Sequence, residues 1–153
     1  MPFSNRFRRS SAIRCNYISY DDPITRHVYK LPMVHVKLTH GSKSIKSVAL
    51  VDSGATSNFL PREIAELLEI PLTEPPDDAV GAGGVFKNIK SMIKKVVLVK
   101  GRDSAYEEFT NLYVLVPVLP DTLPYFILGR DSIFRRFDIK FQERQEKITL
   151  KRH

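Results

Sequence analysis

The feature that most constrains this chain is an aspartate placed at the end of an apolar run. Residues 48–51 are wholly apolar, as in a buried strand, and Asp52, Ser53 and Gly54 follow directly. A carboxylate beside a buried strand carries a large desolvation cost unless neighbouring groups are arranged to hold it. Asp52 is therefore the first candidate for a chemical role.

The length and composition predict one globular domain. The 153 residues are enough for a single hydrophobic core and too few for two ordinary domains. No apolar run approaches the roughly 20 residues that span a bilayer, so we expect no membrane partner and a cytoplasmic location. The one cysteine, Cys15, cannot form an intramolecular disulfide and has no clustered ligands for zinc, so neither a disulfide nor a metal is expected to support the fold.

The basic character of the chain is partly a property of its first residues. The first 20 residues contain no acid and four arginines, Arg6, Arg8, Arg9 and Arg14, so the formal charge of +7 leaves 7 − 4 = +3 for the rest. Residues 1–26 lack sustained periodicity, which predicts a basic flexible arm over 1–26 and a folded domain over 27–153. An organelle presequence in residues 1–20 is an alternative, although no amphipathic apolar face supports it.

Nucleic-acid binding is disfavoured as the main function. Outside the arm, the basic residues are interspersed with acids, which is typical of a solvated surface. Association through the arm is a second alternative, and it predicts strongly salt-dependent binding that is lost when residues 1–20 are deleted.

Alternating residues predict a hairpin that ends at Asp52. Val34, Val36 and Leu38 alternate with polar residues, as in a half-buried strand. Turn residues then lead into a second strand over 45–51, which delivers the aspartate to a strand end. Pro61 suits the first turn of a short helix that follows.

The rest of the chain also reads as strands. Further strands are predicted over 86–99, 109–116, 125–128, 137–141 and 147–151. Residues 109–116 are apolar enough for a central strand buried on both faces. Three glycines among residues 80–85 predict a hairpin tip, and Asp131 is a candidate N-cap for a short helix over 132–136. The predicted fold class is all-β, a single domain with one or two short helices.

Peptide hydrolysis by carboxylates requires a second aspartate. One group must take a proton from water while another protonates the carbonyl oxygen, and two carboxylates sharing one proton supply both. The other two Asp-Ser pairs, at residues 103–104 and 131–132, are not followed by glycine. The partner of Asp52 must then be the Asp52 of a second copy, related by a two-fold axis.

Two segments together carry a family resemblance. Residues 50–60, Leu-Val-Asp-Ser-Gly-Ala-Thr-Ser-Asn-Phe-Leu, and residues 126–131, Phe-Ile-Leu-Gly-Arg-Asp, resemble the two signatures of the retropepsin-like aspartic proteases of retroelements and bacteria. The resemblance spans about residues 33–151. It implies a retropepsin-like acid protease fold with a flap hairpin, and a homodimeric aspartic endopeptidase that cleaves an extended peptide or protein substrate without a cofactor.

The same resemblance assigns roles to individual residues. Asp52 is the catalytic carboxylate, and Ser53 and Gly54 support the active loops. Substrate-binding roles fall on Ala55, Thr56, Gly83, Gly84 and Val85, of which the last three lie in the flap. The second structural signature comprises Gly129, Arg130 and Asp131. Retroviral members usually carry an acid at the position of Thr56, so Arg130 is expected to pair with another acid or with backbone carbonyls.

A binding module that kept this fold and dimer but lost turnover is the main alternative function. The intact Asp52, Ser53 and Gly54 favour the enzyme.

Overall fold

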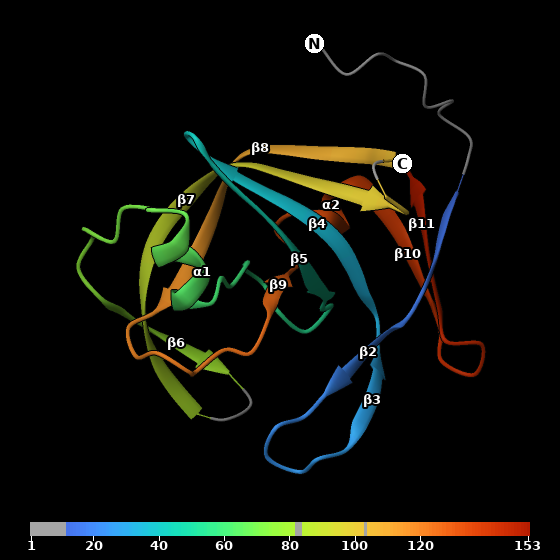
Figure 1. The fold of residues 1–153 in the computed structure, drawn as a ribbon, viewed down its shortest axis with the longest axis horizontal. Coiled ribbons are helices and arrows are strands. Elements are labelled where there is room, and N and C mark those ends of the chain that lie inside the picture. The colour runs from blue at the N-terminus through green and yellow to red at the C-terminus, as the bar shows by residue number, and fades with distance from the viewer. Residues whose placement is uncertain (1–11, 82–83, 103) are drawn as a thin grey trace.

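The computed structural model describes residues 12–81, 84–102 and 104–153, which form mostly strands (Figure 1). The strands are β1 (Ile13–Asn16), β2 (Ile18–Asp21), β3 (Val28–Leu31), β4 (Met33–His40), β5 (Lys43–Val51), β6 (Asp77–Gly81), β7 (Gly84–Lys100), β8 (Ser104–Pro117), β9 (Phe126–Leu128), β10 (Phe137–Gln142) and β11 (Lys147–Arg152). The helices are α1 (Arg62–Leu67) and α2 (Ile133–Arg136). The predicted all-β class with one or two short helices is confirmed. Neither helix is long and apolar enough to cross a membrane, and this holds for every residue described.

The largest sheet brings two distant strand ends together. Its order is β6-β7-β4-β5-β9, and β8 pairs with the other edge of β7. The β4–β5 hairpin follows the predicted alternation, and β5 pairs in parallel with β9 so that Val51 lies opposite Leu128. Asp52 and Gly129, which directly follow these two residues, therefore leave the sheet side by side.

The hydrophobic core lies on one face of this sheet, to which alternating apolar residues of β4 and β7 contribute. Val36 and Leu38 of β4 are buried, and so are their partners across β7, Leu98 and Val96. Burying each such side chain contributes about 1.5–3 kcal/mol. This packing holds β4 and β5 rigid beneath Asp52.

Strand β8 is not the central, doubly buried strand that its composition predicts. Leu112, Val114 and Val116 are buried, but Tyr113 between them is 71% exposed. An apolar run alone does not distinguish a strand buried on both faces from one buried on a single face, because the tyrosine ring tolerates water at its polar tip.

The predicted flexible arm over 1–26 is wrong for residues 13–21. In this range β1 pairs with β11 in a three-stranded sheet of order β1-β11-β10, and β2 pairs with β3 in a two-stranded hairpin. Each strand has four residues, too few for a clear period, and β1 depends on a partner more than 130 positions away. Residues 1–11 of the predicted arm lie outside the described residues.

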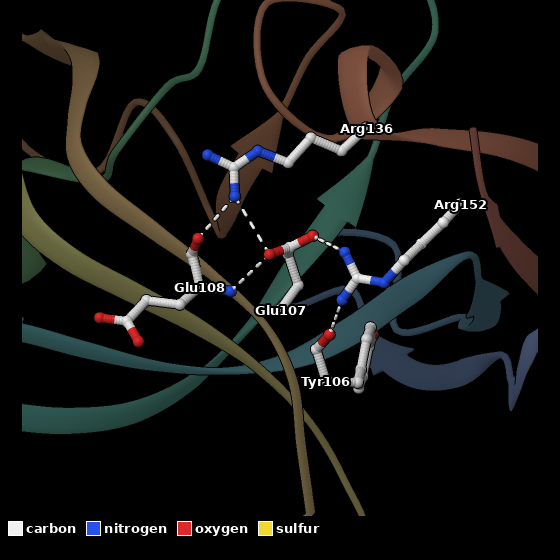
Figure 2. A network of polar contacts seen from close by, with 5 residues as sticks. All are labelled: Tyr106, Glu107, Glu108, Arg136 and Arg152. Carbon is white, nitrogen blue, oxygen red and sulfur yellow. Dashed lines mark hydrogen bonds and ion pairs between the residues drawn. The ribbon is translucent and has the colours of Figure 1, made fainter. Parts of the chain in front are cut away.

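Glu107 joins β8 to α2 and to β11 (Figure 2). Its side chain is 10% exposed, lies 3.1 Å from Nη1 of Arg136 and accepts a hydrogen bond from Nη1 of Arg152. Arg136 also donates to the carbonyl of Glu108, and Arg152 to that of Tyr106. One buried carboxylate thus ties the end of the chain to the long β7–β8 ribbon.

Replacing Glu107 with glutamine should lower the free energy of unfolding by about 2 kcal/mol, because two arginines lose a charged acceptor while remaining partly solvated. Urea denaturation measures the change. Glu108→Gln is the matched control, since Glu108 forms a partly exposed pair with Lys95 at 3.6 Å and its replacement should cost less than about 1 kcal/mol. Equal losses in the two variants would contradict a role for Glu107 in joining these elements.

Candidate active site

Asp52 is held at the point where β5 and β9 end together. Its N–H donates to the carbonyl of Leu128 at 3.0 Å, and its Oδ1 accepts the N–H of Gly54 at 2.8 Å. A Cβ on Gly54 would stand 3.2 Å from this oxygen, so glycine lets the loop close over the carboxylate. Asp52 remains half-buried, whereas Ser53 is exposed. The carboxylate is oriented and still accessible.

The second signature packs against the Asp52 loop through its backbone. Arg130 donates its N–H to the carbonyl of Ala55 at 2.8 Å, and Asp131 donates its N–H to that of Thr56 at 3.1 Å. Gly129, which precedes them, is buried. The Asp52 loop and residues 129–131, which lie more than 70 positions apart in the sequence, thus form one hydrogen-bonded unit.

Asn58 is the central link of this unit, and the sequence did not single it out. Its side chain is 1% exposed, and its Oδ1 accepts the N–H of Gly129 at 3.0 Å and the hydroxyl of Ser132 at 2.6 Å. Its Nδ2 donates to the carbonyl of Tyr113 at 3.1 Å. The one local signal is a polar residue directly before the apolar Phe59, and that signal does not reveal partners more than 50 positions away.

Two expectations about the second signature are wrong. The side chain of Arg130 is exposed, so it carries no buried charge that must be paired. Asp131 does not cap α2: the N-cap is Ser132, which makes no side-chain cap hydrogen bond, and Asp131 instead lies 3.3 Å from Arg135. The hydroxyl of Ser132 bonds to Asn58, because the loop offers it a buried acceptor.

The predicted substrate-binding residues fall in two places. Ala55 and Thr56 lie on the Asp52 loop, half-buried and exposed respectively, whereas Gly84 and Val85 are exposed on the β6–β7 hairpin. Among the described residues no hydrogen bond joins this hairpin to the Asp52 loop. Gly83 lies outside the described residues.

An apolar cavity lies between the β6–β7 hairpin, Phe59 and the loop that follows β8. It measures about 170 Å³ and is lined by Phe59, Val80, Phe86 and Leu123, among others. A larger cavity of about 610 Å³ is lined by β1, β4 and the end of β7 rather than by the Asp52 loop. The smaller cavity adjoins the hydrogen-bonded unit through Phe59, which follows Asn58, and a further cavity of about 190 Å³ is lined by Ser57, Asn58 and Asp131 of the unit itself.

The β2–β3 hairpin and the residue that follows it contact neighbours of Asp52. The rings of Tyr20 and Tyr125 meet edge to face at 5.2 Å, and Val51 donates its N–H to the carbonyl of Pro32, directly after β3, at 3.0 Å. Burial raises the pKa of Tyr125, and the neighbouring Tyr20 and the charge of Asp52 add to the shift. The sequence indicated neither contact, because both depend on tertiary packing.

Other catalytic groups are poorly supported. The part of the chain that the structure describes contains no cluster of three His, Cys, Asp or Glu side chains placed to hold a metal ion. Burial raises the pKa of the Cys15 thiol, which disfavours a thiolate nucleophile. Asp52 is the better candidate.

Comparisons with known proteins agree with this geometry. A family model described as aspartyl protease matches residues 36–132, a span that contains both Asp52 and Gly129. A comparison with curated proteins gave no match. Among solved structures, a retropepsin-like aspartic protease from Rickettsia conorii is similar over 94% of this chain and 95% of that chain, with 21% identity and a TM-score of 0.56. The chain therefore belongs to the aspartyl protease family and has the retropepsin-like fold.

Proposed function

We propose that this protein is an aspartic endopeptidase whose active site forms between two copies of the chain, each supplying one Asp52. The observation that carries the proposal is the Asp52 loop itself. Its carboxylate accepts the N–H of Gly54 and its backbone N–H donates to Leu128 of β9, yet Asp52 stays half exposed. One chain supplies one such aspartate, and the chemistry needs two.

The pair of carboxylates would act as base and acid in turn. The ionised Asp52 takes a proton from water, whose oxygen attacks the peptide carbonyl carbon, while the protonated Asp52 of the other copy gives its proton to the carbonyl oxygen. Collapse of the tetrahedral intermediate breaks the C–N bond, and the leaving nitrogen is protonated. The activity should peak on the acidic side, because the pair must hold one proton.

The neighbouring residues suit an extended peptide. Exposed Ser53 is free to brace the second loop across the dimer, and the backbone around Ala55 and Thr56 can hydrogen-bond a substrate strand. The β6–β7 hairpin, with Gly84 and Val85 near its tip, would act as the flap that excludes water from the reaction. The apolar cavity beneath it would accept an apolar side chain of the substrate.

Activity per protomer should fall on dilution through the range in which the dimer dissociates, because a monomer holds half a site. Peptide cleavage and sedimentation measured on the same samples test this. Inhibition by a statine-type mimic of the tetrahedral intermediate should track the dimer fraction. Constant specific activity in a sample that sedimentation shows to be monomeric would refute a shared site, and a dimer that binds the mimic without cleaving peptides would indicate a binding module.

A further inference from the structure

The β2–β3 hairpin presents apolar side chains away from the core. Its two strands pair with each other, and in Figure 1 it projects from the lower side of the molecule. Ile24 at its turn is 90% exposed, and Val28 at the start of β3 is 63% exposed. Isolated two-stranded hairpins are marginally stable in water, so apolar side chains at such a tip point to a contact surface.

The turn holds these side chains in a defined position. The carboxylate of Asp22 accepts the N–H groups of Ile24 at 2.8 Å and Thr25 at 3.3 Å. The backbone of Asp22 bonds to His27 at 3.0 Å and to Arg26 at 2.9 Å. These four hydrogen bonds hold the turn that presents Ile24 in a fixed geometry, which lowers the entropy cost of binding a partner.

The hairpin stands directly beside the proposed catalytic residue. The carbonyl of Pro32, the residue that follows β3, accepts the N–H of Val51, which directly precedes Asp52. Tyr20 of β2 packs on Tyr125. A stable dimer buries about 800 Å² on each copy, which corresponds to a patch of about 16 Å radius. Val28 lies four residues before Pro32, about 13 Å along an extended strand. A dimer centred on Asp52 therefore reaches along β3 as far as Val28, and Ile24 lies in the turn just beyond it.

We infer that the β2–β3 hairpin forms part of the surface that binds a second copy of this chain, burying Ile24 and Val28 next to the shared site. The inference rests on the proposed function, because the pairing of Asp52 across a two-fold axis sets where the partner lies. The charges fit a contact between identical surfaces: the hairpin carries the acid Asp21 and the exposed bases Arg26 and Lys30, so each copy offers both signs to the other.

The test combines two substitutions, Ile24→Asp and Val28→Asp, in the full chain. Sedimentation equilibrium should show the dimer dissociation constant raised at least about tenfold, because two apolar contacts are replaced by two desolvated charges. The matched control is Leu67→Asp. Leu67 is 65% exposed, α1 lies well apart from the β2–β3 hairpin in Figure 1, and the substitution should leave the dissociation constant unchanged. A paired Ile24→Ser and Val28→Ser variant repeats the test without added charge.

Sedimentation reads assembly without requiring cleavage, so the two proposals can fail separately. A dimer that the hairpin substitutions weaken but that never cleaves peptides would support the hairpin contact and overturn the proposed function. The hairpin contact would be overturned if both hairpin variants, shown by circular dichroism to be folded, formed active dimers with the dissociation constant of the wild type. That result would leave the proposed function unaffected.

Discussion

An Asp52→Asn chain is expected to fold and dimerise as the wild type does and to lose at least about 10³-fold in kcat/KM for peptide cleavage. Asparagine keeps the side-chain oxygen that accepts the N–H of Gly54, so the loop geometry survives. The neutral amide cannot take a proton from water or share one with a second copy. Cleavage of a peptide library, followed by mass spectrometry, measures the loss.

Asp131→Asn is the matched control for this prediction. Asp131 lies in the same hydrogen-bonded unit, but its backbone N–H holds the loop, and its carboxylate meets only the exposed Arg135 among the described residues. Its activity should stay close to that of the wild type.

Mixing Asp52→Asn with wild-type chain adds a test of the shared site. If the two copies exchange freely and a mixed dimer is inactive, activity should fall with the square of the wild-type fraction. A linear fall would mean that each chain works alone.

Replacing Gly129 with alanine is expected to cost at least about 4 kcal/mol in the free energy of unfolding, one of the largest effects available in this chain. A Cβ at this position would stand 2.6 Å from the carbonyl oxygen of Ala55 and closer still to that of Ser57. Both obstacles are backbone atoms, so no side-chain rotation relieves the clash. The loop at Ala55 and Ser57 would have to move away from Gly129, and activity would fall together with stability.

Gly41→Ala is the control that distinguishes the cost of this steric clash from the cost of replacing a glycine with positive φ. Gly41, in the β4–β5 turn, has a φ of 61°, and an added Cβ would meet nothing within 4 Å. Its replacement should cost about 1 kcal/mol from backbone strain alone. Urea denaturation of the two variants gives the comparison, and a Gly129→Ala chain no less stable than Gly41→Ala would show that the two loops do not pack as described.

Prediction from the sequence succeeded where local periodicity carries the information. The alternation in β4 placed Val34, Val36 and Leu38 in the core, and Pro61 marked the start of α1. It failed for β1 and β2, whose four-residue strands depend on partners that local pattern does not reveal. It also overestimated the burial of Arg130, because the expected salt bridge came from the resemblance and not from the packing of this chain.

The sequence by itself determined the apolar strand before Asp52 and the all-β class, because each follows from residue type and local order. Only the tertiary structure decided what holds Asp52: the parallel pairing of β5 with β9, the buried amide of Asn58 and the backbone contacts of Arg130 with Ala55. Those contacts join segments more than 70 positions apart. Their partners are set by how the whole chain packs, so no local pattern could name them.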